Sequence, residues 1–287
     1  MVSIVDLRRE YHLRVCNEII RTQKDTKKRE YPNFADGTNR ASIEIAWGIV
    51  NRLNFTPGYE SLTGQTTGGR FEVITKDFLK KAFKLLHHLR PGDWVYSTQL
   101  PISKFDQYEH LAELEEIIKQ NSDLASALGR DYIIAPDIVV GRWPIPDEEI
   151  NTEGKIISRS ESIAKLTPLR SDNYQSPRLT LHASISCKWI LRSDRSQNAR
   201  TEALNLIRNR KGLLPHVVAV TAEPLPTRIA SLALGTGDLD CVYHFALYEL
   251  EDALKQIDNE DQIDMLSTLV EGRRLRDISD LPFDLAI

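Results

Sequence analysis

Apolar side chains recur every three or four residues in several parts of the chain, the spacing that predicts an amphipathic helix. The clearest example is 4–23, where one stripe contains Ile4, Leu7, Tyr11, Val15 and Ile19. Further helices are predicted over 41–53, 75–89, 107–128 and 197–211. The last forty residues are acidic and are also expected to be helical.

A segment rich in threonine and glycine, 55–70, interrupts this pattern and predicts a loop. Glu72 would then lie at the start of the helix that follows. Pro91-Gly92 would end the helix predicted over 75–89. The apolar face of that helix would comprise Phe78, Ala82, Leu85, Leu86 and Leu89.

The pattern changes in the second half of the chain, where short β-rich runs predict strands over 132–140, 179–190, 216–222 and 241–245. Residues 144–176, rich in Pro, Asn, Ser and Asp, indicate an excursion from the core. Strands separated by helices predict an α/β fold with a central sheet flanked by helices. Because no segment has the composition of a linker, residues 1–287 are expected to form a single domain.

Composition narrows the class of protein. Hydrophobic residues make up 41% and charged residues 27% of the 287 positions, which excludes a disordered or collagen-like chain. The formal net charge of −4 excludes a wholly basic surface but allows a local basic patch. Three widely spaced cysteines, Cys16, Cys187 and Cys241, indicate neither a disulfide framework nor a zinc site. The charged N-terminus, and the lack of an apolar run of about 20 residues, predict a soluble, cytoplasmic protein that does not enter a membrane.

Two of the predicted strands carry charged residues within apolar surroundings. Ser186 and Lys188 are two residues apart, so on a strand they project from the same face. A lysine in an apolar strand needs a partner, and Asp137 in another predicted strand is the obvious one. The pair would form a shared polar site with a shifted lysine pKa. The structural alternatives are a capping role for Asp137 and a Lys188 side chain that extends to water.

Glu202 lies beside the apolar stripe of the helix predicted over 197–211 and could point back toward the edge of the sheet. Asp137, Glu202 and a lysine could then surround a hard divalent cation such as Mg²⁺, which takes one or two carboxylates together with phosphate oxygens. Such ions promote phosphodiester hydrolysis by activating water and stabilising the leaving oxygen. Lys188 would orient the water or neutralise charge in the transition state.

A basic segment overlaps this region. Between 188 and 211 there are seven positive residues against two acids, an excess that suits contact with phosphates. A solvated helix face is the alternative, and it is favoured for the last turn of the predicted helix. Arg192, Asp194 and Arg195 have the chemistry that reads G·C pairs, because arginine donates to guanine O6 and N7 and aspartate accepts from the cytosine amine. A local ion pair among these three is the structural alternative.

Taken together, the run Ser-Cys-Lys at 186–188, the run Arg-Ser-Asp-Arg at 192–195 and the glutamate at 202 resemble the CCGG-recognising type II restriction endonucleases, a branch of the PD-(D/E)XK nucleases. Matching segments extend over 36–243, and the resemblance is closest to an enzyme that cuts GCCGGC. In this family a serine replaces the acid two residues before the lysine, and a glutamate of the next helix takes its place. This sequence has both features.

The resemblance implies a PD-(D/E)XK core with a mixed sheet, a magnesium cofactor and a set of catalytic residues. Those residues are Asp137, Lys188, Glu202, Glu72 and Ser186. Asp137 would be the metal-bridging carboxylate, Lys188 the catalytic lysine and Glu202 the displaced acid, acting on the metal through water. The backbone carbonyl of Cys187 would be a further metal ligand, and Glu72 a further active-site acid.

The resemblance also implies which residues read the DNA. Arg192, Asp194 and Arg195 would read the inner CCGG, and their side chains suit G·C pairs in the major groove. Arg228 and Asp36 would read the outer G·C pair. Gln65 would contact the minor groove at the centre of the site, where only G·C and A·T can be distinguished.

The implied activity is magnesium-dependent cleavage of double-stranded GCCGGC after the first G, which leaves 5′ CCGG overhangs. The implied assembly is a homotetramer made of two dimers, because a palindrome is matched by a two-fold dimer. A cognate DNA methyltransferase would protect the host. Two alternatives from the residues alone are a repair or structure-specific nuclease without sequence preference and a non-cutting DNA-binding regulator.

Overall fold

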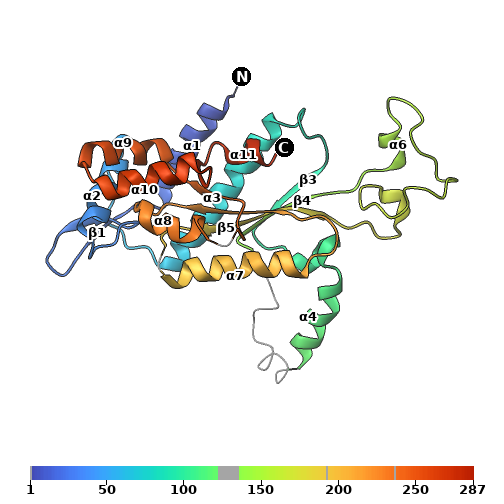
Figure 1. Ribbon diagram of the computed structural model, residues 1–287, viewed down its shortest axis with the longest axis horizontal. Coiled ribbons are helices and arrows are strands. Elements are labelled where there is room, and N and C mark those ends of the chain that lie inside the picture. The colour runs from blue at the N-terminus through green and yellow to red at the C-terminus, as the bar shows by residue number, and fades with distance from the viewer. Residues whose placement is uncertain (1, 122–135, 192, 236) are drawn as a thin grey trace.

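The computed structural model describes residues 2–121, 136–191, 193–235 and 237–287, with the backbone alone for 114–115, 118–119 and 193–197 (Figure 1). Its centre is a six-stranded sheet in the order β3-β4-β5-β6-β7-β8. β3, β4 and β5 are antiparallel, whereas β5 to β8 are parallel, so the sheet is mixed. The strands are β3 (Trp94–Ser97), β4 (Ile138–Arg142), β5 (Thr180–Lys188), β6 (His216–Thr221), β7 (Cys241–His244) and β8 (Leu275–Asp277).

Helices flank this sheet, which confirms the predicted α/β fold class. They are α1 (Ile4–Glu18), α2 (Arg40–Arg52), α3 (Gly64–Leu85), α4 (His110–Gln120), α6 (Asp147–Ile150), α7 (Ser193–Asn209), α8 (Pro226–Ala233), α9 (Leu247–Ile257), α10 (Glu260–Glu271) and α11 (Leu281–Asp284). Short 3-10 turns occupy Ile102–Lys104, Asp106–Tyr108 and Ser171–Asn173. A separate hairpin pairs β1 (Thr22–Lys24) with β2 (Glu30–Pro32). The prediction of a single domain stays a prediction.

Helix α1 matches its predicted apolar stripe but ends earlier than expected, at Glu18 rather than 23. Ser3 caps it by accepting the Asp6 N–H, and Asp6 in turn accepts the Ser3 N–H, a reciprocal capping box. Leu7, Tyr11, Val15 and Ile19 are all buried. The chain then turns into β1, because residues after Ile19 pair with the 55–60 region and with β2 instead of continuing the helix.

The loop predicted over 55–70 is wrong for 64–70, because α3 begins at Gly64. Thr63 caps the helix by accepting the Thr66 N–H, and Phe71 packs edge-on against Trp189. This packing outweighs the roughly 1 kcal/mol that each glycine costs inside a helix. Glu72 therefore lies in the third turn of α3 rather than at its start.

The far end of α3 also differs from the prediction. The helix ends at Leu85 rather than 89. Of the predicted apolar stripe, Leu86 is buried, but Leu85 and Leu89 are exposed at 36% and 57%. Phe78 and Ala82 are buried as predicted, and Leu79 and Phe83, which were not in the predicted stripe, complete the buried face of the helix.

Strand boundaries were predicted less well than strand positions. Of the run 132–140, residues 132–135 lie outside the described residues, and β4 begins only at Ile138. Asp137 is therefore not in the strand but in the bend directly before it. In the same way α4 covers His110–Gln120 of the helix predicted over 107–128, and 122–128 lie outside the described part. Strand β8 was not predicted, since the acidic C-terminal region reads as helical throughout.

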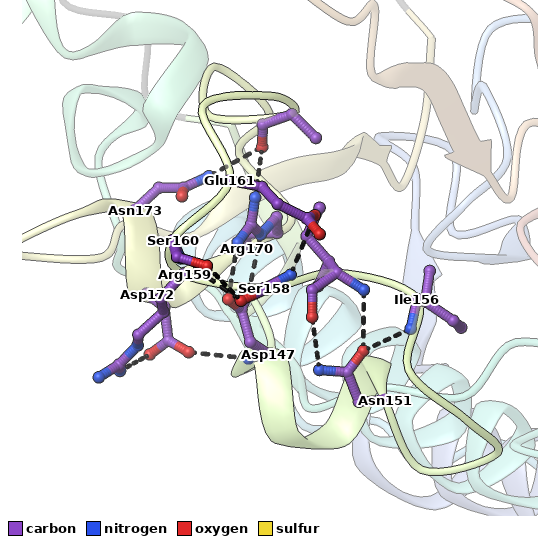
Figure 2. A network of polar contacts seen from close by, with 12 residues as sticks. Asp147, Asn151, Ile156, Ser158, Arg159, Ser160, Glu161, Arg170, Asp172 and Asn173 are labelled. Atoms are coloured by element: carbon purple, nitrogen blue, oxygen red, sulfur yellow. Dashed lines mark hydrogen bonds and ion pairs between the residues drawn. The ribbon is translucent and has the colours of Figure 1, made fainter.

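The predicted excursion is present between β4 and β5, and it projects from the body of the protein around α6 (Figure 1). Polar contacts hold it together (Figure 2). Arg170 and Asp147 form a buried two-pronged ion pair with N–O distances of 2.8 and 2.6 Å. Asp172 accepts the Asp147 N–H at 2.9 Å, and Asn151 accepts the N–H groups of 156 and 157. Because β4 and β5 are antiparallel, this excursion joins the ends of the two strands that lie away from Asp137 and Lys188.

In the described part of the chain, no helix combines the length and the apolar character needed to cross a bilayer.

Candidate active site

An open cleft of about 1100 Å³ lies at the C-terminal end of β5, between the N-terminal halves of α3, α7 and α8. It gathers most of the residues that the sequence singled out. Those that line it are Asp36, Gln65, Glu72, Asp137, Cys187, Lys188, Glu202 and Arg228. They come from positions almost 200 residues apart, so the cleft is a product of the tertiary fold.

Asp137 is the centre of this arrangement. The pairing of Ile138 with Ile185 places Asp137 beside the end of β5. Its Oδ2 accepts the Cys187 N–H at 2.7 Å and the Lys188 ammonium at 3.0 Å, with a longer 3.4 Å contact from the Ser186 hydroxyl. Within the described residues, no hydrogen bond reaches the other oxygen, Oδ1. One oxygen of Asp137 is thus fixed by the end of β5, and the residue itself lines the cleft.

The predicted proximity of Lys188 to Asp137 and Ser186 is confirmed. Ser186 and Lys188 share the face of β5 on which α7 packs, as the strand alternation requires. The Lys188 side chain is 15% exposed. Burial lowers its pKa, but the charges of Asp137 and Glu202 outweigh that effect and raise the pKa of the ammonium. Lys188 therefore stays protonated and can donate hydrogen bonds.

Glu72 and Glu202 reach the same place from opposite sides of the sheet, Glu72 from α3 and Glu202 from α7. Burial raises the pKa of both carboxyl groups; the charge of Asp137 raises it further, while Lys188 lowers it. The helix α7 fixes Glu202 because Ala199, Ala203 and Leu206 around it are almost fully buried.

Among the described side chains, the carboxyl groups of Asp137, Glu72 and Glu202 surround the Lys188 ammonium, and a cation would relieve the repulsion between these acids. No group of three or more His, Cys, Asp or Glu side chains is gathered closely enough to form a metal cage among the described residues. The donors nevertheless fit a hard cation such as Mg²⁺, which needs only one or two carboxylates and keeps several waters. Asp137 Oδ1, the Glu202 carboxylate and the carbonyl of Cys187 are the oxygens available for this.

The Cys187 thiol is not available for chemistry. It is buried, and burial together with the charges of Asp137 and Glu72 places its pKa well above the ordinary value. A thiol that stays protonated is a poor nucleophile and a poor metal ligand. If this residue acts in the site, it does so through its backbone.

The residues expected to read the outer base pair contact each other. Arg228, in the first turn of α8, forms a salt bridge with Asp36. Hydrogen bonding from the Thr38 hydroxyl, with a further contribution from Arg228, lowers the pKa of Asp36 to about 2. Gly37 and Ser42 set the position of Asp36, because Ser42 Oγ accepts its N–H at 2.9 Å and Gly37 packs against the ring of Tyr31.

Glu223 is a charged residue of the cleft that the sequence analysis missed. It is 1% exposed and lies just after β6, where it accepts the N–H groups of Leu191 at 2.9 Å and Leu225 at 3.3 Å. Its Oε1 lies 3.9 Å from Arg228. Burial raises its pKa to about 7, against the lowering effect of these contacts. A lone glutamate after an apolar strand gave no signal in the sequence, because one partner, Leu191, is 32 residues away. Leu225 and Arg228 are near in sequence, but the sequence does not show that the chain turns back toward Glu223 there.

The remaining predicted residues are described less fully. Gln65 lies in the first turn of α3 and faces the cleft. Arg192 lies outside the described residues. Asp194 and Arg195 belong to the first turn of α7, where the side chains lie outside the described part of the chain.

The sequence and the structure were compared with those of known proteins. The sequence pattern of the NgoMIV restriction enzyme family matches residues 11–287. The type II restriction enzyme NgoMIV of Neisseria gonorrhoeae is 51% identical over 267 residues, which cover 91% of this chain and 92% of that protein. Among solved structures, the type IIF restriction endonuclease Bse634I with cognate DNA is 16% identical with a TM-score of 0.38, over 85% of this chain and 98% of that one. A second Bse634I structure is 14% identical with a TM-score of 0.36, at the same coverage.

Proposed function

Because this chain belongs to the NgoMIV restriction enzyme family, it is a type II restriction endonuclease that cleaves DNA site-specifically, and we propose that its target is GCCGGC, cut after the first G. The observation that carries the assignment of the site is the convergence of Asp137, Lys188 and Glu202 in the same cleft as the Arg228–Asp36 pair. A cutting centre and a pair of base-reading side chains then face one bound duplex.

A divalent cation is implied by the family, and we propose that it is Mg²⁺, held by Asp137, Glu202 and the carbonyl of Cys187. When bound, such an ion makes a water more acidic and withdraws charge from the phosphate. Lys188, fixed 3.0 Å from Asp137, donates to the attacking water or to a non-bridging phosphate oxygen. Ser186 orients Asp137. Glu72, whose pKa burial raises, is placed to accept a proton at the edge of the cleft.

Recognition follows from the same chemistry. Arg228 donates to guanine O6 and N7, and Asp36 accepts from the amine of the paired cytosine, so one G·C pair replaces the salt bridge between them. Arg192, Asp194 and Arg195 would read the inner CCGG in the same way, and Gln65 would check the centre from the minor groove. A base pair other than G·C would leave at least one of the two charges unmatched, and this mismatch is the basis of the proposed outer specificity.

We propose further that the chain forms a homotetramer of two dimers. A palindrome requires a two-fold dimer. The excursion between β4 and β5 lies far from the cleft and exposes several large apolar side chains, and contact with a second subunit would remove them from water. The most exposed are Leu166 at 94%, Ile156 at 68% and Ile163 at 64%. A methyltransferase of the same sequence would complete the restriction-modification system.

The proposed target is tested with a plasmid that carries two GCCGGC sites. Incubation with Mg²⁺ should give two defined fragments with 5′ CCGG ends, read by end sequencing, and EDTA should abolish cleavage. A plasmid in which both sites are changed to ACCGGT is the control and should remain intact. Smearing would indicate a structure-specific nuclease instead, and retardation without cleavage would indicate a regulator.

The tetramer is tested by sedimentation velocity. The double variant Ile156→Asp, Leu166→Asp should sediment as a dimer where the wild type is a tetramer, because two charges per subunit cannot be buried without partners. The matched control changes two exposed leucines outside the excursion, Leu213 and Leu214, to aspartate and should leave the tetramer intact. A tetramer that persists in the excursion variant contradicts the proposed interface.

A further inference from the structure

The β1–β2 hairpin forms one wall of the cleft without contributing to the catalytic or base-reading residues. Gln23 on β1 pairs with Tyr31 on β2, and both line the cleft. Beyond this pair the hairpin continues to a tip with the sequence Lys-Asp-Thr-Lys-Lys-Arg at 24–29. Figure 1 shows the hairpin reaching outward at the end of the molecule where α3 and α7 begin.

The tip is an ordered turn. Asp25 Oδ1 accepts the N–H groups of Lys27 and Arg29, each at 2.8 Å, and its carbonyl accepts the Lys28 N–H at 3.0 Å. Lys28 adopts a left-handed conformation with φ of 62° to close the turn. Because the backbone is already fixed, a partner that binds the tip does not have to order it, and little conformational entropy is lost.

The tip also concentrates positive charge on a protein whose net charge is −4. Four cations face one acid over 24–29. Lys24 pairs with Glu30 at 3.1 Å, and Arg29 pairs with Asp25 at 2.7 Å. Lys27 and Lys28 are exposed and form no salt bridge with any residue in the described ranges. Two ammonium groups are therefore presented to solvent beside a cleft that binds a polyanion.

The position of the hairpin fixes which part of the duplex it would meet. A Cβ atom on Gly37 would lie 2.7 Å from the ring of Tyr31, so the hairpin packs directly against the residue that follows Asp36. Asp36 is the proposed reader of the outermost base pair. A duplex read at its outer pair by Asp36 would continue past the hairpin, and the groups that it offers there at every sequence are its phosphates.

We propose that the β1–β2 hairpin binds the phosphate backbone of DNA that flanks the recognition sequence, with Lys27 and Lys28 as the contacting groups. This inference rests on the proposed function of the cleft. The contact carries no sequence information, since phosphates are the same at every position. It adds affinity that depends on the length of the flanks and on salt, and it leaves the choice of target to the cleft.

The experiment measures duplex binding by fluorescence anisotropy in EDTA, with GCCGGC flanked on each side by either two or ten base pairs. The wild type should bind the long duplex more tightly than the short one. The variant Lys27→Gln, Lys28→Gln should lose most of that difference. Its plot of log Kd against log salt should be shallower by about two units per subunit on the long duplex, because each phosphate contact contributes a slope of about 0.9. Discrimination between GCCGGC and ACCGGT should not change.

A matched control changes the same charge elsewhere: Lys80→Gln, Lys84→Gln on the exposed side of α3 should keep the flank effect of the wild type. A hairpin variant that keeps the full flank effect overturns the inference, as does an equal loss in the α3 variant, which would mean that net charge alone acts. A different result would contradict the proposed specificity of the cleft: a wild-type protein that binds GCCGGC no more tightly than ACCGGT.

Discussion

Changing Asp137 to alanine should reduce the rate of cleavage at least about a thousandfold, because stabilisation by a catalytic metal amounts to several kcal/mol. The substitution removes the carboxylate through which the cation would be held. It also removes the acceptor of the Cys187 N–H and of the Lys188 ammonium, so the lysine loses its fixed position. Binding of GCCGGC should persist in EDTA, because no base-reading residue is changed.

The measurement is single-turnover cleavage of a labelled duplex with Mg²⁺, beside anisotropy without metal. Asp240→Ala is a close structural control. Asp240 also directly precedes a strand and accepts an N–H from its neighbour, that of Val217 at 2.8 Å, but it lies at the opposite end of the sheet. This control should cleave at the wild-type rate. Cleavage by the Asp137 variant within tenfold of the wild type would refute the role assigned to this carboxylate.

Changing Arg228 to alanine should relax the choice of the outer base pair while the inner CCGG is still required. A good arginine–guanine contact is worth about 1–3 kcal/mol of discrimination in each half-site, so cleavage of ACCGGT relative to GCCGGC should rise by about 5- to 150-fold for each changed half-site. Asp36 and Glu223 would lose a cationic neighbour, so some loss of thermal stability is expected as well.

The measurement is the ratio of kcat/KM for GCCGGC and for ACCGGT, compared with the same ratio for a duplex altered in the inner CCGG. Arg14→Ala is the control for the loss of an ion-paired arginine. Arg14 forms salt bridges with Glu18 and Asp77, and its side chain is about as exposed as that of Arg228. It should alter stability without altering the ratio. An unchanged ratio in the Arg228 variant would remove this residue from the reading set.

The local part of the catalytic arrangement could be predicted from sequence. The two-residue spacing of Ser186 and Lys188 dictates a shared face once the segment is a strand, and an apolar strand leaves Lys188 in need of an acid. The structure has that acid at 3.0 Å. What spacing could not give was the exact place of Asp137, which lies in the bend before β4, because its preceding residues are as apolar as the strand itself.

Long-range contacts could not be predicted in this way. The salt bridge between Arg228 and Asp36 spans 192 positions, and nothing in either local sequence specifies it. Glu223 was missed for the same reason. The start of α3 was missed because the glycines at 64, 68 and 69 are typical of a loop. The Thr63 cap and the packing of Phe71 on Trp189 stabilise a helix there instead. The roles of the individual residues in cutting and reading remain predictions.

The excursion that follows β4 joins the ends of β4 and β5 that are remote from Asp137 and Lys188, and its own ion pair of Asp147 with Arg170 stabilises it. Insertions, deletions or replacements in that lobe can therefore accumulate without altering the register that sets Asp137 beside Lys188. Evolution, or an engineer, could exchange one excursion for another while the contacts of Asp137 with Cys187 and Lys188 are inherited intact.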